Sequence, residues 1–409
     1  MAAADLQPMA VTPRAPGEYA PAAGARAVAA LQDTAAPLRG ARVLHVSVAG
    51  AEGRVPELLG GMLSLAAGAG LEVDWRVLFG PPELRATAAA LQSGLRGGES
   101  GIEEPAWEEY IDSCERTARS LSDGYDAIVL HDAAVGLVTG LDGSAVWRVH
   151  EDFSKPESEA LGRITALADH CSAVLVPHDS FALEGFAGDR LHVAAPDIDP
   201  LDPRNLELET RLPGRVVRPL GVDLDRPFCL QVLELDRWDD PHAAIDSFRL
   251  AKAEEPELQL VLAALLDGAA TEGWQAAKEI SDYAESTDDV RLLTTYEGLG
   301  SLELGALLLL GRVVIERSLR EGFELAPFEA LWKRTPVVGG LPLAIRDGVD
   351  GFLAPGAAEA AARIVELVRD PGLAIEMGRA GRERVREHFL VTAALERELR
   401  ALAATVKAA

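Results

Sequence analysis

Short hydrophobic runs alternate with longer helical segments from about residue 41 onward. The run at 42–48 is apolar, rich in β-branched residues and brief, which is typical of a buried strand. The stretch at 55–70 predicts a helix that ends at glycine. Because short apolar strands separated by helices indicate a parallel sheet covered on both faces, the pattern predicts a doubly wound α/β domain. Its further strands are predicted at 71–78, 125–131, 145–150 and 172–177.

The same alternation begins again after a break in composition. Residues 196–216 contain four prolines and many acids, which predicts a linker or interdomain segment. The hydrophobic runs beyond it predict a second doubly wound α/β unit. Two such domains in tandem would face a cleft, and ligands of such sheets bind outside the carboxyl ends of the strands. The second set of strands is predicted at 229–235, 258–265, 290–293, 312–316 and 335–340.

Four segments are expected along the chain. Residues 1–38 are predicted to be a mobile tail rich in alanine and proline, and residues 39–205 a Rossmann-like domain. Residues 206–385 are predicted to form a second Rossmann-like domain, and residues 386–409 a helix that packs back toward the first domain. The first 38 residues hold no continuous apolar segment, so no signal peptide is predicted.

Composition and charge limit the classes of partner that the protein is expected to bind. Hydrophobic residues make up 48% of the 409 residues and charged residues 25%, which is ordinary for a globular protein. The 39 basic and 65 acidic residues give a net charge of −26, which repels nucleic acid and anionic membrane. An anionic ligand would therefore need a local basic patch. The most apolar run, 304–315, is too short to span a bilayer, and a cytoplasmic location is expected.

Cysteine usage predicts neither disulfides nor a metal site. Cys114, Cys171 and Cys229 form no CxxC pair, and no nearby histidine gives them metal-ligand spacing. They are expected to be small buried hydrophobic residues in a reducing compartment.

Two glutamates with seven residues between them stand in SLREGFELAPFEALWKRTPVVGG, residues 318–340. They are Glu321 and Glu329, and the segment resembles the signature region of retaining GT-B glycosyltransferases. Other segments, among them VWRVHEDFS and LDRWDDPHAAIDSFRLAK, are similar in order to those of trehalose-synthase-type glycosyltransferases over roughly residues 41–395. The resemblance implies a GT-B fold with an acceptor-side first domain and a nucleotide-sugar-side second domain. It implies transfer from a nucleoside-diphosphate sugar to a sugar or small-molecule acceptor, without a cofactor.

The resemblance also assigns roles to single residues. Glu321 corresponds to the glutamate that contacts the donor sugar, Glu329 to the one that holds the ribose, and His150 to a histidine near the reacting carbon. Taken alone, the glutamates would be helix-start acids favoured by the helix dipole, and His150 a strand-end histidine with a satisfied hydrogen bond. His131 and Asp132 also end a strand as in the family. There the structural interpretation is favoured, because Ala133–Ala134 replaces the proline and glutamine that the family has next.

The positions expected to hold the donor diphosphate have changed. The family's arginine aligns with Glu234 and its lysine with Asp239, so both cations have become anions. A carboxylate about 4 Å from a phosphate charge costs on the order of 4 kcal/mol at an effective dielectric constant near 20. The free-energy cost of two such reversals is comparable with the whole binding free energy of a micromolar ligand, about 8 kcal/mol. A third carboxylate, Glu324, stands where the family has glycine at a helix start.

Other residues of the expected donor site are candidates to replace part of the lost positive charge. In the first-domain loop AGAEGRVPE, Gly53 is expected to approach the donor and Arg54 could replace a lost cation, although Glu52 opposes it. Arg237 is a second candidate cation. Gly322 and Phe323 complete the expected donor-binding set. The acids lack EF-hand spacing, so a solvated acidic face is expected and no metal site.

Three functions remain open from the sequence. The first is an active retaining hexosyltransferase. The second is a catalytically inactive relative that binds a protein partner, such as an active paralogue. The third is a sugar-binding protein that has lost the phosphate site. Relatives of this type often form dimers, so a homodimer is a further expectation.

Overall fold

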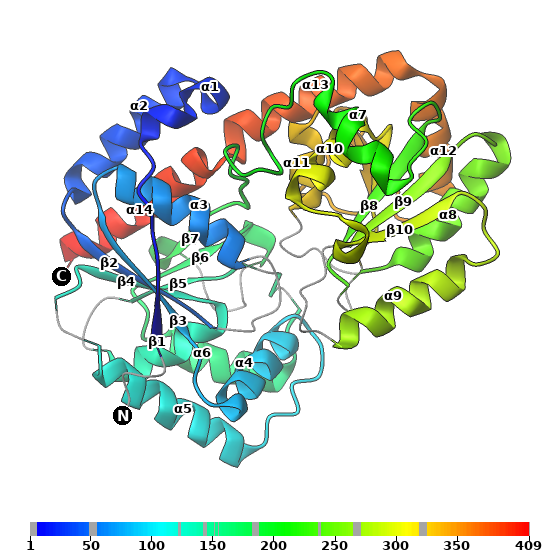
Figure 1. Ribbon diagram of the computed structural model, residues 1–409. Coiled ribbons are helices and arrows are strands. Elements are labelled where there is room, and N and C mark those ends of the chain that lie inside the picture. The colour runs from blue at the N-terminus through cyan, green and yellow to red at the C-terminus, as the bar shows by residue number, and fades with distance from the viewer. Residues whose placement is uncertain are drawn as a thin grey trace. The chain divides into compact units, whose positions relative to one another are not determined.

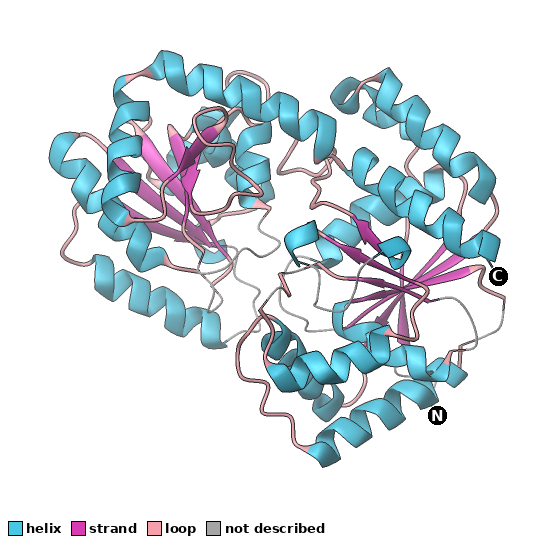
Figure 2. Ribbon diagram, turned by 180° about the vertical axis from the view of Figure 1, so that it is seen from behind, coloured by secondary structure: helices cyan, strands magenta, loops and turns pink. Residues whose placement is uncertain are grey.

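The computed structural model describes residues 6–48, 55–121, 124–141, 145–150, 152–153, 155–181, 188–235, 239–264, 271–318 and 325–408. The chain divides into two compact units, Met1–Asp199 with Leu390–Ala409, and Pro200–Phe389. Each is a sheet between layers of helices (Figure 1, Figure 2). The division after Asp199 lies a few residues before the one predicted from the sequence.

The first unit contains a seven-stranded sheet of order β1-β3-β2-β4-β5-β6-β7. β1 is antiparallel to β3, and the remaining pairs are parallel. The order of the parallel strands reverses between β2 and β4, which is where doubly wound sheets bind ligands. Five of these strands lie where the sequence predicts them, and β1 and β7 were not predicted. The strands are β1 (Leu6–Met9), β2 (Arg42–Val48), β3 (Glu72–Leu78), β4 (Ala127–His131), β5 (Ala145–Arg148), β6 (Ala173–Val176) and β7 (Leu191–Val193).

Alternation along the strands builds two different faces of this sheet. Leu44, Val46 and Val48 of β2 join a large apolar core with α4, α5 and α6. The residues between them point to the opposite face, which α3 and α14 cover, and α2 packs on α14 (Figure 1). The helices are α1 (Ala20–Ala23), α2 (Ala25–Ala35), α3 (Val55–Gly68), α4 (Pro82–Leu95), α5 (Glu104–Arg119), α6 (Ser158–Ala168) and α14 (Val391–Ala408).

The prediction of a mobile tail is wrong for residues 6–38. β1 pairs with β3, and Tyr19 and Leu31 are fully buried. The backbone N–H of Arg14 donates to the carbonyl of Ser64 on α3 at 2.9 Å. Close approach there depends on Gly68, because a Cβ at that position would lie 1.8 Å from the carbonyl oxygen of Arg14. The alanine-rich composition concealed the apolar stripe by which α2 packs.

The second unit contains a six-stranded parallel sheet of order β10-β9-β8-β11-β12-β13. This is the strand order 3-2-1-4-5-6 of dinucleotide-binding Rossmann domains, with its switch point between β8 and β11. All five strands predicted here are present, and β13 was not predicted. The strands are β8 (Phe228–Leu233), β9 (Gln259–Ala264), β10 (Val290–Thr294), β11 (Val313–Glu316), β12 (Val337–Gly339) and β13 (Gly351–Leu353).

Helices cover both faces of the second sheet (Figure 2). Cys229, Leu260 and Ile315 pack with apolar residues of α8 and α12. All three cysteines of the chain are buried free thiols, as predicted. None of the described helices is long and apolar enough to cross a membrane. The helices are α7 (Leu212–Val217), α8 (Pro241–Glu254), α9 (Thr271–Ala284), α10 (Ser301–Leu310), α11 (Ala326–Trp332), α12 (Ala357–Arg369) and α13 (Pro371–His388).

Candidate functional site

Three histidines form a buried row across the first sheet. His45 lies on β2, His131 is the last residue of β4, and His150 follows β5. Nδ1 of His45 lies 3.2 Å from Nε2 of His131, and Nδ1 of His131 lies 2.8 Å from Nε2 of His150. None of the three exposes more than 2% of its surface. Strand register and alternation place the row on the face that α14 covers.

Burial keeps the histidine row neutral. Burial lowers the pKa of His45 to about 4; the Glu398 carboxylate opposes that shift and Arg148 adds to it. Burial, the other two rings and Arg148 hold the pKa of His131 well below its usual range. Burial and Arg148 do the same to the pKa of His150. At neutral pH each imidazole is therefore uncharged and carries one N–H.

Asp132 fixes the backbone of His150. Its Oδ1 accepts the N–H of His150 at 2.9 Å. Asp132 itself has a φ of +46°, a left-handed conformation that aspartate adopts more readily than most residues. Burial raises the pKa of Asp132 to about 7, although this hydrogen bond and nearby arginines oppose the shift. The sequence favoured a structural role for His131 and Asp132, and the structure places both in direct contact with His150.

A buried ion pair lies beside the row. Nη1 of Arg148 contacts the carboxylate of Glu398 on α14, and its Nη2 lies 3.9 Å from Oδ2 of Asp197. All three side chains are at most 3% exposed. Burial raises the pKa of Asp197 to about 7, and Arg148 opposes the shift. Sequence reasoning missed Glu398 because it lies 250 residues from Arg148, on a helix whose pattern indicates only an amphipathic segment.

In the second unit, an internal carboxylate occupies backbone donors at the switch point. Glu234 directly follows β8, and Oδ2 of Asp239 accepts the N–H groups of Glu234 at 2.9 Å and Leu235 at 2.7 Å. Leu235 has a φ of +58°, a left-handed conformation that is uncommon for leucine. Successive backbone N–H groups in such turns are the donors that bind anions in other proteins. Here the carboxylate of Asp239 accepts two of these N–H groups, in the place of a bound anion.

Glu316 adds a further carboxylate at the same edge of the sheet. It ends β11, is 4% exposed and accepts a hydrogen bond from Oγ of Ser318 at 2.5 Å. Burial raises the pKa of Glu316 to about 7; the Ser318 bond opposes the shift and the charge of Glu234 adds to it. The backbone N–H of Asp240 donates to the carbonyl of Arg317 at 2.8 Å, which ties the segment after β8 to the segment after β11.

Glu329 has an ion-pair partner within its own unit. It lies in the first turn of α11 and is 1% exposed. Its Oε1 accepts a hydrogen bond from Nη1 of Arg204 at 3.2 Å. Nearby, Nε1 of Trp332 donates to the carbonyl of Asn205 at 2.9 Å. Together these bonds hold the segment around residues 204–205 against α11.

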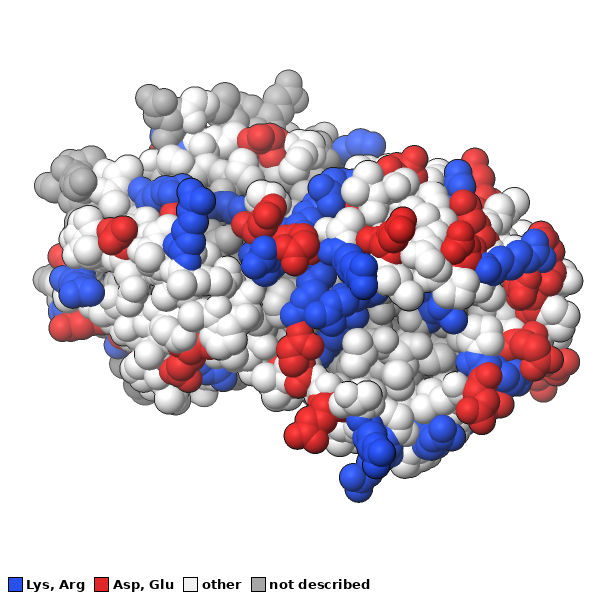
Figure 3. Space-filling model, turned by 90° about the horizontal axis from the view of Figure 1, so that it is seen from above, with Lys and Arg blue, Asp and Glu red and all other residues white. Residues whose placement is uncertain are grey.

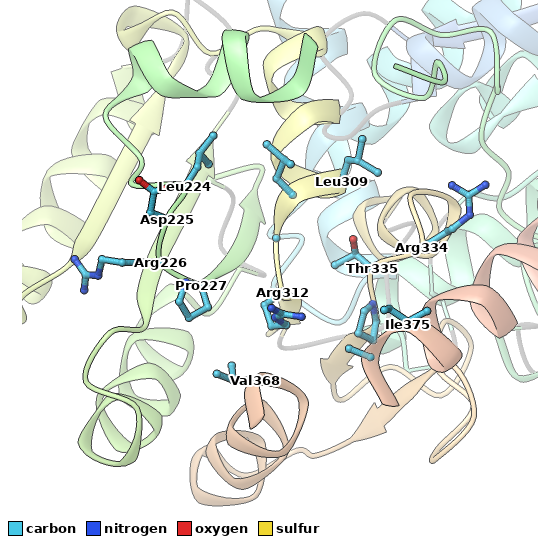
Figure 4. Close-up of a pocket in the computed structure, with 14 residues that line it drawn as sticks. Leu224, Asp225, Arg226, Pro227, Leu309, Arg312, Arg334, Thr335, Val368 and Ile375 are labelled. Atoms are coloured by element: carbon cyan, nitrogen blue, oxygen red, sulfur yellow. The ribbon is translucent and has the colours of Figure 1, made fainter. Parts of the chain in front are cut away.

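A cavity of about 420 Å³ opens at the opposite edge of the second sheet. Pro227 directly precedes β8 and Arg312 directly precedes β11, so the cavity lies at the amino ends of these strands. Ligands of doubly wound sheets bind at the carboxyl ends, which makes this cavity distinct from the Glu234–Glu316 edge. Figure 4 shows lining residues Leu224, Asp225, Arg226, Pro227, Leu309, Arg312, Arg334, Thr335, Val368 and Ile375.

The net charge of −26 is not spread as a uniform acidic coat. On the face seen in Figure 3, lysine and arginine side chains lie among the acids. Within the described residues, no group of three or more histidine, cysteine, aspartate or glutamate side chains has an arrangement that could hold a metal ion.

Comparison with known proteins identifies the family of this chain. The family model "Trehalose synthase, N-terminal domain" matches residues 45–183, and "Glycosyl transferases group 1" matches residues 216–384. The trehalose synthase of Rubrobacter xylanophilus is 37% identical over 390 residues, which cover 91% of this chain and 92% of that protein. The chain belongs to the trehalose-synthase-type glycosyltransferases. The trehalose synthase of Pyrococcus horikoshii is 28% identical and covers 93% of this chain and 94% of its own length.

Solved structures show that this trehalose-synthase-type protein has the GT-B fold. Sucrose-phosphate synthase from Thermosynechococcus elongatus superposes with a TM-score of 0.69 at 17% identity, covering 90% of this chain and 100% of that chain. Anabaena Alr3699/HepE, solved in complex with UDP and glucose, superposes with a TM-score of 0.64 at 16% identity, covering 89% and 100%. The predicted pair of Rossmann-like domains is confirmed.

Only part of the expected site of this trehalose-synthase-type chain is described. His150, Glu329, Glu234 and Asp239 have the surroundings given above. The sequence identified His150 but gave no sign of the row behind it, which forms only when three separate strands align. The remaining expected residues lie outside the described residues: Gly53, Arg54, Arg237, Glu321, Gly322, Phe323 and Glu324.

Proposed function

We propose that the protein transfers a hexosyl group from a nucleoside-diphosphate sugar to a sugar or small-molecule acceptor, with retention of configuration. One observation carries the proposal: His150 is held by its backbone to Asp132 and by its ring to His131 at the carboxyl end of the first sheet. Separate restraints on the backbone and on the ring of one buried residue are typical of a group that must be positioned for a ligand. The similar Anabaena protein was solved with UDP and glucose, which supports this ligand class.

In the proposed reaction His150 contacts the sugar near its reacting carbon. Because its imidazole is neutral, it can exchange hydrogen bonds with a sugar hydroxyl without placing a charge there. Glu321 contacts the donor sugar and Glu329 the ribose, both as proposals from the family. The leaving diphosphate gains negative charge, which Arg54 and Arg237 must stabilise because Glu234 and Asp239 cannot. The protein acts in the cytoplasm and needs no cofactor.

A second candidate function is favoured by the carboxylate edge of the second sheet. Asp239 uses two N–H groups there, and Glu234 and Glu316 add two further carboxyl groups. Such an edge disfavours a diphosphate by electrostatic repulsion. The alternative is therefore a sugar-binding or partner-binding relative without transferase activity.

Calorimetric titration with UDP-, ADP- and GDP-glucose, each with and without Mg²⁺, distinguishes the two. Micromolar binding of one donor, followed by transfer to glucose that His150→Ala and Glu321→Ala each abolish, is the result expected for the transferase. No binding at millimolar donor, together with binding of free glucose, would instead establish the sugar-binding alternative. Thr165→Ala serves as a control that should retain activity, because the half-buried Thr165 hydroxyl donates only to the carbonyl of Leu161 within α6.

A further inference from the structure

The hydrogen bonds of the histidine row allow only two arrangements of protons. Each contact needs one proton between its two nitrogens, and each neutral ring carries one. If His150 donates from Nε2 to Nδ1 of His131, then His131 must donate from Nε2 to Nδ1 of His45, and His45 carries its proton on Nε2. In the opposite arrangement every ring carries its proton on Nδ1. The three rings therefore change tautomer together.

The buried ion pair makes the two ends of the row unequal. Arg148 is the cross-strand neighbour of His131 and lies two residues before His150, and its cation lowers the pKa of all three rings. The Glu398 carboxylate raises the pKa of His45 and outweighs the effect of Arg148 there. A proton is therefore more stable at the His45 end than at the His150 end. Exchanging one arrangement for the other moves one proton between these two ends. The electrostatic field of the pair favours protons on Nε2 of all three rings.

We propose that His45 and His131 are positioning residues that hold His150 in the Nε2–H tautomer, with the direction of the row set by the Arg148–Glu398 pair. Nδ1 of His150 is then kept as a hydrogen-bond acceptor, and a sugar hydroxyl that meets it must donate. The inference rests on the proposed function for its consequence, since the hydroxyl belongs to the proposed substrate. The tautomer itself can be measured without substrate.

Long-range ¹H–¹⁵N correlation spectra of the full-length protein, labelled with ¹⁵N-histidine, test the inference at neutral pH. Signals are assigned by replacing His45, His131 and His150 one at a time. The expected result is an unprotonated Nδ1 and a protonated Nε2 in all three rings. Nδ1–H forms of all three, or a mixture of tautomers among them, would overturn the proposal. The tautomers are determined on the wild-type protein, and the variants serve only to assign its signals.

Glu398→Gln tests the origin of the direction. Loss of the carboxylate should shift the ratio of Nδ1–H to Nε2–H forms about tenfold in all three rings at once, which equals about one pKa unit. Glu396→Gln on the same helix is the matched control, because Glu396 pairs with the exposed Arg400. Equal spectra for the two variants would contradict the role of Glu398. If Glu398→Gln does not fold, the double variant Arg148→Gln with Glu398→Gln removes both charges, and a row still fully in the Nε2–H form would again contradict it.

The inference and the proposed function fail in different ways. If the spectra show the expected tautomers but His150→Ala retains full transfer and sugar binding, the proposed role of His150 is wrong. The inference that all three rings hold the Nε2–H tautomer then still stands. If His150→Ala abolishes transfer but the wild-type rings show mixed tautomers, the proposed role stands and the positioning inference is wrong.

Discussion

The carboxylate of Asp239 accepts the backbone N–H of Glu234 at 2.9 Å, at the end of the first strand of the second sheet. The same oxygen accepts the next N–H, that of Leu235, at 2.7 Å. In a Rossmann-type sheet this edge is where phosphate groups are bound. Asp239 therefore does more than remove a cation, because it also uses the local donors that a diphosphate could accept from.

Reversing the charge at both positions should restore nucleotide binding. In Glu234→Arg with Asp239→Lys, two repulsions of roughly 4 kcal/mol each become attractions, and two N–H groups are released. We expect the affinity for at least one nucleoside-diphosphate glucose to rise more than tenfold, as measured by calorimetric titration. Asp239→Asn, which removes one charge and keeps an acceptor oxygen, should produce a smaller gain.

The matched control changes the net charge equally at a distant place. Glu285→Arg with Asp288→Lys alters two exposed acids of the same unit and should leave nucleotide affinity unchanged. If the Glu234 and Asp239 double variant shows no binding at millimolar donor, the pocket has diverged beyond these two positions.

The pH dependence of stability should carry the signature of Glu316. Its pKa is raised from 4.5 to about 7 in the folded protein, mainly by burial, so folding favours its protonated form. Stability from this group is present below pH 4.5 and is lost as pH rises toward 7. Glu316→Gln removes this titration. Between pH 4.5 and 8, we expect the free energy of unfolding of the variant to rise by about 3 kcal/mol relative to that of the wild type.

Urea unfolding at several pH values measures this difference. The exposed Glu285→Gln provides the comparison and should follow the wild type at every pH. A constant offset between Glu316→Gln and the wild type across this range would show that Glu316 ionises normally in the folded state.

Two glycines of one helix should respond in opposite directions to alanine. A Cβ at Gly68 would lie 1.8 Å from the backbone oxygen of Arg14, whereas a Cβ at Gly60 meets nothing within 4 Å. We expect Gly68→Ala to destabilise the protein by about 1–3 kcal/mol, since backbone must move. Gly60→Ala should stabilise it by about 0.5–1 kcal/mol, because alanine favours the helix. Thermal or urea unfolding gives both values, and a neutral Gly68→Ala would mean that residue 14 does not pack on α3.

Breaking the Arg148–Glu398 pair should cost far more than breaking an exposed pair on the same helix. Arg148→Met leaves the Glu398 carboxylate buried without its cation, for which we expect a loss of about 3–5 kcal/mol in the free energy of unfolding. Arg400→Met breaks the exposed pair with Glu396 and should cost less than about 1 kcal/mol.

A double variant tests the origin of that cost. Adding Glu398→Leu to Arg148→Met removes the stranded charge and should recover much of the stability. Losses that simply add would indicate that packing, and not the charge pair, accounts for the effect.

Sequence patterns predicted most of the sheet architecture, for a physical reason. Strands such as β2 and β9 are buried on both faces, so they appear as unbroken hydrophobic runs. The edge strands β1 and β13 are brief, and β1 contains a proline, so neither stands out. The alanine-rich stretch before residue 39 has the composition of a tail because its helix buries only a narrow stripe.

The candidate site was less accessible to sequence reasoning. His150 and Glu329 carry a family motif and were identified from it. His45, Asp197 and Glu398 have no local pattern that distinguishes them, and they become partners only when distant segments pack together. The replacement of two cations by the acids Glu234 and Asp239 was evident from the sequence. The hydrogen bonds that Asp239 makes were not, because they depend on the left-handed turn at Leu235.

The last helix has a consequence for the order in which the protein can be made. The first unit runs to Asp199 and is completed only by Leu390–Ala409, after the whole second unit has been translated. Until then, Arg148 has been synthesised without Glu398, and the N–H of Val391 has not reached the carbonyl of Ile198, 3.0 Å away in the finished protein. On the ribosome, N-terminal domains usually fold first. Here the first unit cannot be completed in that order, and the second unit is free to finish folding before it.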